Sequence, residues 1–301
     1  MANPRVLDKR RKSIRNIKKI TRTMELIATA RFKRAMDRAT AASDYTRRIA
    51  GVVSDLANAG LEVSHPLLNQ RETTNRARML VLTANRGLCG GYNGNVIRLA
   101  VAQRKLLTEL TSNEVILDVA GKRGETGFKF RNVPTTNRYL QFDDRPAYDD
   151  VEQIANEYLL QYEAGEIDRL DVVYTQFVTS ARQVAVYETL LPLGSLGGGS
   201  PTSSPSLAKL EGKQTLIYQF IPSAESILEE IVPMSFKVKL FKCFLDAAVS
   251  EQIARMVAMK NATESANEMI GMLSRTYNRA RQSQITNQIM EIIGGVEAMD
   301  G

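Results

Sequence analysis

Cysteine and histidine are scarce in this chain of 301 residues, and this scarcity argues against several kinds of functional site. Cys89 and Cys243 lie far apart and lack the short spacing of a metal or redox motif. His65, the one histidine, precedes a proline in an expected turn, so it indicates neither a metal site nor a catalytic triad. We expect both cysteines to be packing residues of a protein in a reducing compartment, with no metal or other cofactor.

Long apolar runs are also missing. No stretch approaches the roughly 18 apolar residues of a membrane-spanning helix, so we expect no direct membrane insertion. Proline is absent after Pro233, and Gly271 is the one glycine between that proline and Gly294. Because proline and glycine are the main helix breakers, this absence predicts one long helix from about Ser235 to Ile293.

Both ends of the chain carry a seven-residue repeat of apolar or small side chains. The N-terminal column, with Ile17 and Met24 beside it, is Leu7, Ile14, Thr21, Ala28, Ala35, Ala42, Ile49 and Leu56. The C-terminal column is Leu245, Gln252, Met259, Ala266, Leu273 and Ala280, with Ala248, Ala262 and Met269 beside it. A long helix needs a partner along its length, and alanine-rich columns let two helix axes approach closely. Since both segments flank one intervening domain, we expect an antiparallel two-helix coiled coil.

Between these segments the hydrophobic period changes to that of short strands. Strands are expected at 79–83, 115–119, 172–177 and 184–190, and helices at 95–110 and 148–164. The first two strands and the helix between them form a βαβ unit, most simply parallel and right-handed. The last strand is polar enough for a sheet edge. The expected fold class is therefore α/β, a small α/β domain inserted between two coiled-coil helices.

Three expected parts follow from this division: an N-terminal coiled-coil helix at 1–65, an α/β foot domain at 66–225, and a C-terminal helix with an apolar tip at 226–301. Gly51 and Gly60 are candidate breaks in the first helix, which should end before His65 and Pro66. The Gly/Ser/Pro-rich stretch 195–206 predicts a flexible loop, and 215–220 a short strand. Pro233 marks a kink or a restart near the beginning of the last helix.

A glycine-rich loop at 85–94 follows a strand and precedes a helix, as phosphate-binding loops do. It lacks the Gly-Lys-Ser/Thr ending of a P-loop, and its glycines miss the dinucleotide spacing. A tight turn that requires positive φ therefore fits better than a nucleotide site, although a nucleotide-dependent enzyme stays open. The weaker Gly121-Lys122-Arg123-Gly124 is interpreted as a basic turn.

Positive charge is concentrated at the N-terminus. Residues 1–50 hold 15 Lys and Arg against 4 Asp and Glu, a net of +11, so the rest of the chain carries −4 of the total +7. Such an arm suits nucleic acid, an anionic membrane face or acidic protein loops. Apolar residues of the kind usually buried (Ile14, Ile17, Ile20 and Met24) lie between the charges, which argues against a DNA-reading basic region and against a transit peptide. The apolar tip, 285–299, needs an enclosing apolar surface.

Four blocks of sequence resemble one family closely. They are residues 18–31 (KKITRTMELIATAR), 86–91 (RGLCGG), 250–263 (SEQIARMVAMKNAT) and 277–286 (YNRARQSQIT). The blocks are similar to those of the γ subunit of the F-type rotary ATP synthase, occur in the same order and span nearly the whole chain. The runner-up interpretation is a basic coiled-coil nucleic-acid-binding protein.

The resemblance implies a non-catalytic central stalk that couples the rotation of a proton- or sodium-driven rotor to nucleotide changes in a catalytic hexamer. Implied partners are the α and β subunits, the ε subunit and the membrane ring of c subunits, at the cytoplasmic face of a bacterial inner membrane. Implied partner contacts are Met24, Arg255, Arg281, Gln282 and Thr286. Arg31 and Lys33 are our own candidates for facing acidic β-subunit loops, and the rotor-facing surface is expected between Gly212 and Pro222.

Overall fold

The computed structural model describes residues 4–58, 66–68, 71, 74–111, 115–142, 145–193 and 224–300. The chain forms two compact units. One, here called the two-helix unit, comprises residues 1–30 and 254–301, and the other, the α/β unit, comprises residues 31–253. Each unit is described by itself.

Two helices are much longer than the rest. Helix α1 spans Pro4–Asn58 and helix α5 spans Ala224–Asp300, so at about 1.5 Å per residue they extend for roughly 80 and 115 Å. The expected end of the first helix before His65 is confirmed, whereas the candidate break at Gly51 is wrong, because α1 continues through it. A restart at Pro233 is also wrong, since this proline lies inside α5.

The α/β unit is built on a five-stranded sheet in the order β3-β2-β1-β4-β5. The strands are β1 (Ala77–Leu82), β2 (Ile116–Ala120), β3 (Arg138–Tyr139), β4 (Arg169–Thr179) and β5 (Arg182–Leu191). Strands β1 to β4 pair in parallel, and β5 joins β4 antiparallel at the edge. The parallel pairing and the edge strand confirm the sequence prediction, and β3 is a strand that the pattern did not reveal.

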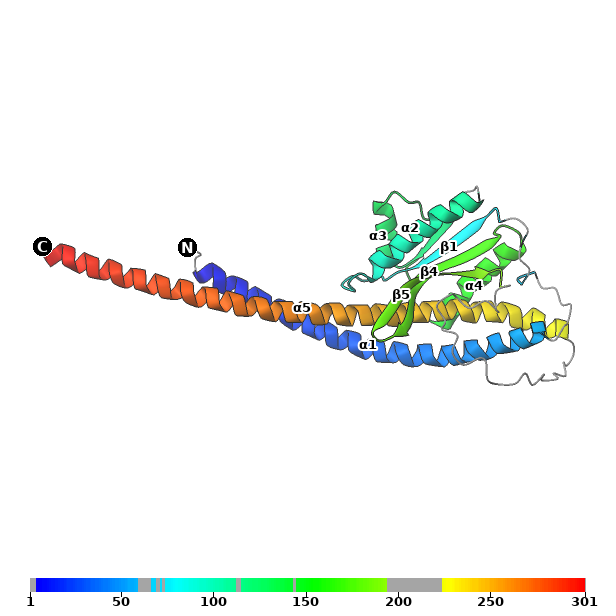
Figure 1. Ribbon diagram of the computed structural model, residues 1–301, viewed down its shortest axis with the longest axis horizontal. Helices are drawn as coiled ribbons and strands as arrows, with labels where there is room; N and C mark the ends of the chain where they lie inside the picture. Colours follow the sequence, from blue (N-terminus) through cyan, green and yellow to red (C-terminus); the bar gives the residue numbers. More distant parts are fainter. Residues whose placement is uncertain are drawn as a thin grey trace. The chain divides into compact units, whose positions relative to one another are not determined.

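Helices cover both faces of this sheet. They are α2 (Tyr92–Thr111), α3 (Lys122–Phe130) and α4 (Tyr148–Glu163), with α2 and α3 on one face and α4 on the other (Figure 1). Residues of β1 alternate between the two cores: Met79 and Val81 pack with α2 and α3, and Leu80 and Leu82 with α4 and α5. Because both faces are buried, most side chains of the central strands β1 and β2 are apolar.

Helix α3 corrects the interpretation of residues 121–124 as a basic turn, because the helix begins at Lys122 directly after β2. Gly121 has φ of 99°, and a Cβ there would lie 2.1 Å from the carbonyl oxygen of Thr83. A Cβ on Gly124 would lie 2.5 Å from the Thr83 Oγ1 atom. The two glycines therefore let the first turn of α3 pack directly against the end of β1.

A buried ion pair joins β1 to β2. The Arg78 Nε atom donates to the Asp118 Oδ2 atom at 2.6 Å, and Tyr158 of α4 donates to the same oxygen at 2.9 Å. The backbone N–H of Asn137 donates to Asp118 Oδ1 at 3.0 Å. Since the carboxylate accepts from three elements, its charge is compensated, and the network fixes α4 and the β3 edge on the sheet.

Some expectations lie outside the described residues. These are the roles of Gly60 and His65, the loop at 195–206, the strand at 215–220 and the rotor-facing surface at 212–222. Cys89 and Cys243 are both buried, as expected of packing residues.

Replacing Gly121 by alanine should destabilise the α/β unit by at least about 2 kcal/mol, because positive φ and the contact with the Thr83 carbonyl both oppose a Cβ. Gly94 is the matched control: it lies in α2, and a Cβ at this position would meet nothing within 4 Å, so Gly94→Ala should stabilise by about 0.5–1 kcal/mol. Urea unfolding of the three proteins measures both changes, and equal effects of the two substitutions would contradict this account.

A second prediction concerns Asp246 of α5. Burial raises the pKa of this carboxyl from 3.8 to about 6; Lys242 opposes the shift and Glu188 adds to it. The folded state therefore binds the proton more tightly than the unfolded state, and stability falls as pH rises from about 4 through 6. Asp246→Asn removes this loss and should be the more stable form at pH 8, by up to about 3 kcal/mol, with the advantage shrinking towards pH 4. The exposed Asp149→Asn is the control, because it removes one carboxylate from the surface and tests whether a lost negative charge alone explains the difference.

Candidate functional site

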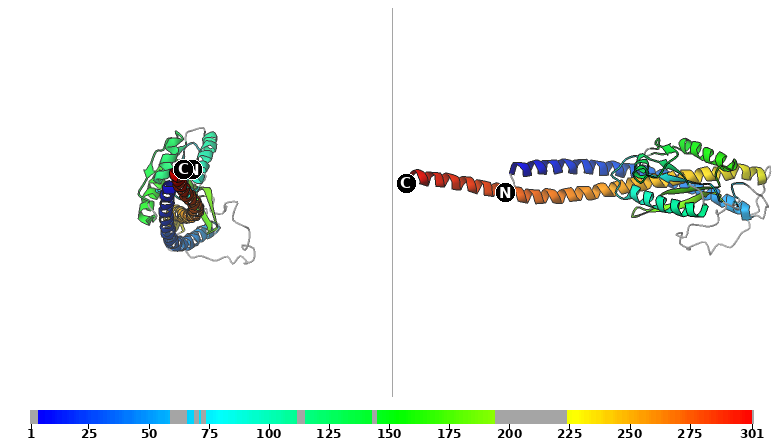
Figure 2. Two further views of the ribbon diagram at one scale, coloured as in Figure 1. Left: turned by 90° about the vertical axis from the view of Figure 1, so that its left-hand side faces the viewer. Right: turned by 90° about the horizontal axis from the view of Figure 1, so that it is seen from above.

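In the two-helix unit, α1 and α5 lie side by side and antiparallel (Figures 1 and 2). The Thr21 and Thr263 hydroxyls meet at 2.7 Å, and the Arg11 guanidinium lies over the Tyr277 ring, 4.7 Å from its centroid. Moving from Thr21 back to Arg11 on α1 therefore corresponds to moving forward from Thr263 to Tyr277 on α5. These contacts confirm the expected antiparallel pairing within this unit.

The seven-residue columns form the seam of the pair. On α1, Leu7, Thr21 and Ala28 are buried, and Ala28 is 0% exposed. On α5, Met259 and Ala266 are buried, and the column continues half-buried at Leu273 and Ala280. Because most of these side chains are small, the helices approach closely and the seam buries little apolar surface area.

One polar contact lies within this seam. Thr21 and Thr263 are both buried, and Thr263 Oγ1 also donates to the Met259 carbonyl at 2.8 Å. Thr21 Oγ1 likewise has a carbonyl acceptor on its own helix, Lys18, at 3.1 Å. One hydroxyl can therefore donate to its own helix while it accepts from the other, so the pair is satisfied inside the seam.

Several apolar side chains that we expected to be buried are exposed instead. Ile17 is 44% exposed, Ile20 59% and Met269 42%, so their predicted burial is wrong. Val6, Ile17, Ile20 and Ile27 follow one another at helical spacings of 11, 3 and 7 and form an outer apolar stripe on α1. The signal for this stripe was present in the sequence as a second apolar column beside the seam.

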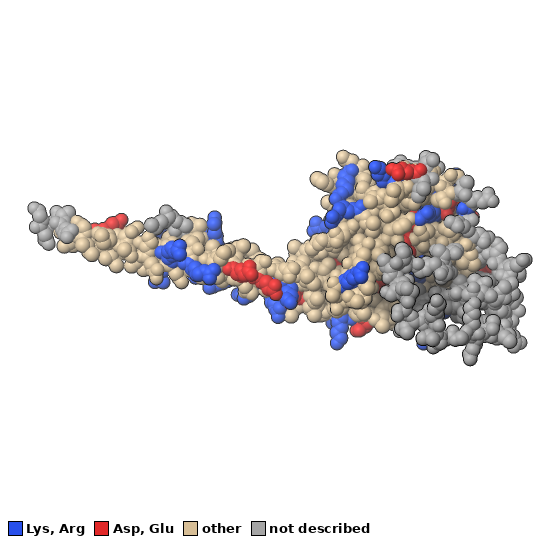
Figure 3. Space-filling view, in the orientation of Figure 1, with Lys and Arg blue, Asp and Glu red and all other residues tan. Residues whose placement is uncertain are grey.

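The C-terminal end of α5 is the most exposed apolar surface of the unit. Every described side chain from Gln284 to Val296 is exposed. The large apolar ones, at 44 to 68% exposure, are Ile285, Ile289, Met290, Ile292, Ile293 and Val296. On the face drawn in Figure 3, charged atoms are sparse over these turns. These side chains belong to the apolar tip, of which the structure describes the side chains of residues 285–296.

Charge in the two-helix unit is borne mainly by α1. Residues 1–30 hold nine Lys and Arg and two Asp and Glu, whereas residues 254–301 hold five of each. Asp8 accepts from Lys12 and Arg11, which lowers the pKa of its carboxyl, and Arg22 pairs with Glu25. The remaining excess of positive charge, beside an apolar stripe, suits a partner surface that is acidic and apolar.

The residues implied as partner contacts occupy different environments. Met24 and Arg31 are half-buried, Lys33 is exposed, and Arg255 is only 6% exposed. Arg281, Gln282 and Thr286 are exposed within two turns of α5, where Thr286 Oγ1 donates to the Gln282 carbonyl at 3.0 Å. The structure brings the last three together just before and within the apolar tip, and it does not gather the whole set into one cluster.

The glycine-rich loop is braced by its own side chains. Asn93 accepts from the Ala84 N–H at 2.9 Å and donates to the Cys89 sulfur at 3.1 Å, while Asn85 accepts from the Lys122 N–H at 3.0 Å. Positive φ occurs at Gly90, as expected of a tight turn, and also at the exposed Leu88. The amide groups that hold this turn indicate a structural connection between β1, α2 and α3.

Over the described residues, no three His, Cys, Asp or Glu side chains are grouped as metal ligands are, and no helix is long and apolar enough to cross a membrane.

Comparison with known proteins gives consistent results. A family model described as ATP synthase matches residues 3–299. The chain is 65% identical to an ATP synthase gamma chain of Rhodopirellula baltica over the full length of both, and 36% identical to one of Leptospira biflexa over 99% of this chain and 100% of the relative. Among solved structures, a chain of the Euglena gracilis mitochondrial ATP synthase matches with a TM-score of 0.64 at 17% identity, over 98% of this chain and 94% of that one. A chain from the central stalk and c-ring of the Tetrahymena thermophila mitochondrial enzyme matches with a TM-score of 0.55 at 20% identity, over 81% and 99%.

Enlarging Ala28 to leucine should separate the two helices, because its side chain is fully buried in the seam. We expect a loss of about 1–3 kcal/mol in the free energy of unfolding, as for other overpacked interiors. Ala30→Leu, an exposed position on the same helix, is the matched control and should change stability by less than about 0.5 kcal/mol. Circular dichroism during urea unfolding measures both, and a neutral Ala28→Leu would show that the seam is not tightly packed.

Proposed function

This chain belongs to the ATP synthase γ chain family, the central stalk of the rotary enzyme, and we propose that it transmits rotation without catalysing a reaction itself. As a subunit of an ATP synthase complex it is peripheral to the membrane. In this proposal an ion-driven membrane rotor turns the stalk, and the asymmetric paired helices press in turn on each catalytic subunit of a surrounding ring.

The apolar tip is the observation that carries the proposal. Six large apolar side chains lie exposed on the last turns of α5, and no described helix covers them. Burying each such side chain is worth about 1.5–3 kcal/mol, so leaving all six in water would be costly. A surrounding apolar sleeve made by partner subunits removes this cost. Smooth apolar contacts also suit a rotating axle, because they lack the directional hydrogen bonds that would hold it at one angle.

The seam supplies the rigidity that such an axle needs. The fully buried Ala28 and the Thr21–Thr263 hydrogen bond lie where the two helices pack closely. An isolated helix would bend under load, whereas two closely packed helices resist bending and unwinding together. The positive charge on α1 then faces outward, where acidic loops of the β subunits would attract it.

The chemistry is assigned to the partners. The glycine-rich loop is the one segment of the sequence that resembles a nucleotide-binding loop. The side chains of Asn93 and Asn85 accept backbone hydrogen bonds that hold this loop in place. We therefore propose that nucleotides bind to the α and β subunits of the hexamer. The c-subunit ring and the ε subunit are the proposed partners at the other end, with residues 212–222 facing the rotor and the complex at the cytoplasmic face of a bacterial inner membrane.

A nucleic-acid-binding function is not supported. The relatives named above are gamma chains of ATP synthase, and the positive charges of α1 are interleaved with a packed seam and an outer apolar stripe. A basic region that reads DNA is instead polar on the faces that contact the groove.

Reconstitution with the α and β subunits of the same complex tests the proposal. The full chain should form a stable assembly that hydrolyses ATP and rotates a bead attached to the α/β unit. Replacing Ile289 and Ile293 by serine should weaken assembly or torque, while Asn287→Ser with Glu291→Ser, also four residues apart and exposed, should not. Nucleotide binding by the isolated chain, or an assembly that rotates equally well with a serine-substituted tip, would contradict the assignment.

Reversal of Arg31 and Lys33 to glutamate tests the acidic-loop contacts. Exposed ion pairs contribute up to about 1 kcal/mol each, so the double variant should lower ATP-driven rotation roughly threefold to thirtyfold. Lys105→Glu with Lys129→Glu makes the same charge change at exposed positions of α2 and α3 and should have a smaller effect. Equal losses in both variants would indicate a response to net charge, and an unchanged rate would remove these two residues from the contact surface.

A further inference from the structure

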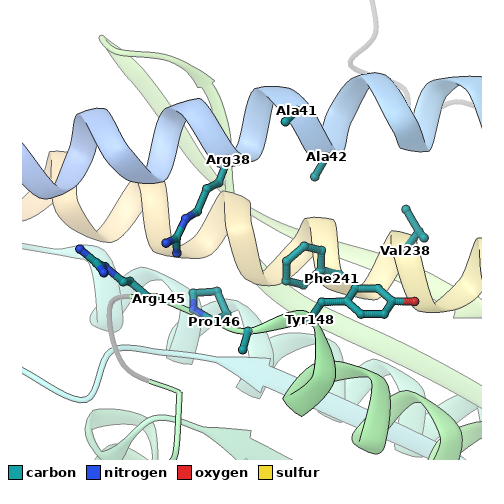
Figure 4. Close-up of a pocket in the computed structure, with 9 residues that line it drawn as sticks. Arg38, Ala41, Ala42, Arg145, Pro146, Tyr148, Val238 and Phe241 are labelled. Atoms are coloured by element: carbon teal, nitrogen blue, oxygen red, sulfur yellow. The ribbon is translucent and has the colours of Figure 1, made fainter.

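An open cavity of about 630 Å³ lies at the surface of the α/β unit, between α1, α5 and the segment that leads into α4 (Figure 4). Four of the residues that line it, Arg38, Ala41, Arg145 and Ala147, are exposed to solvent. Its lining residues are Arg38, Ala41, Ala42, Arg145, Pro146, Ala147, Tyr148, Val238 and Phe241. None of the implied partner contacts lines this cavity.

Small side chains create the space. Ala41 and Ala42 of α1 face the cavity together with Ala147, which precedes the first turn of α4. The far side is aromatic: Tyr148 and Phe241 pack edge to face, with their ring centroids 5.4 Å apart and an interplanar angle of 83°. Val238 extends this apolar wall along α5. The volume and the mostly apolar lining are those of a small-molecule site.

The two charged side chains that line the cavity are both positive. Arg38 comes from α1 and Arg145 from the segment before α4, and Figure 4 draws both at the same end, away from Val238 and Tyr148. Neither guanidinium forms an ion pair or hydrogen bond with the described part of the chain. The nine lining residues include no acid. Because no acid in the lining offsets these two positive charges, the end of the cavity that they share favours an anion.

We propose that this cavity binds an amphipathic monoanion, a carboxylate with an apolar tail of about ten carbons. The carboxylate would lie between Arg38 and Arg145, and the tail would run over the alanines towards Phe241 and Val238. A ligand in this position contacts both long helices and α4, so binding stabilises their packing within the α/β unit.

Calorimetric titration of the full chain with decanoate tests the proposal. We expect one saturable site per chain and a rise in the unfolding temperature of the α/β unit. Decanol has the tail without the charge, and acetate the charge without the tail. Decanol should bind at least about tenfold more weakly than decanoate, and acetate should give no measurable heat.

Substitutions separate the charge from the apolar space. Arg38→Gln with Arg145→Gln should weaken decanoate roughly tenfold or more and leave decanol unchanged. The matched control is Arg34→Gln with Arg182→Gln, two exposed arginines that do not line the cavity, and it should bind decanoate normally. Ala41→Trp fills the cavity from an exposed helix position and should abolish binding of both compounds.

Three results would overturn the proposal. The first is the absence of saturable decanoate binding in a chain whose circular dichroism shows it to be folded. The second is equal affinity for decanol and decanoate, or an unchanged affinity in the double glutamine variant. The third is loss of decanoate binding when the chain is assembled with its partner subunits, which would make the cavity a seat for a partner protein.

Discussion

The close approach of two antiparallel helices through small side chains is the constraint on which the rest of the two-helix unit depends. Ala28 is fully buried, and the Thr21 and Thr263 hydroxyls meet inside the seam. Because many residues of the seam are small, the apolar surface between the two helices is too narrow to form the core of a larger helical bundle. It gains stiffness from contact along its length, and its larger apolar side chains remain available for other subunits.

That division explains why so much apolar surface faces water in the isolated chain. Ile17 and Ile20 point outward from α1, and the apolar tip of α5 has no described covering helix. In a protein that acts alone such surface would favour aggregation. In a stalk enclosed by partner subunits it is the contact surface. The α/β unit differs, since its parallel strands are covered on both faces and the buried Arg78 and Asp118 of its central strands form an ion pair.

Much of the fold was predictable because its signals are local. The absence of proline and the scarcity of glycine after Pro233 predicted α5, and the repeat through Leu7, Thr21 and Ala28 predicted the seam. The run around Leu80 predicted β1. Errors arose where tertiary contacts override local preference. Pro233 suggested a kink or a restart, yet α5 continues through it as one helix. Gly121 and Gly124 suggested a basic turn, although they permit the first turn of α3 to pack closely against Thr83.

The sequence by itself determined the helical repeat, the α/β order of the middle region, the concentration of positive charge and the four blocks that identify the family. These properties are encoded by residues near one another in the chain, where period and composition can be read directly. Only the tertiary structure decided which side of each helix is covered. A heptad column fixes one buried face, but whether Ile17 lies beside that face or outside it depends on how closely the partner helix approaches. The same is true of Arg38 and Arg145, more than a hundred positions apart in the chain, which both line one cavity because α1 and the segment before α4 pack beside the same part of α5.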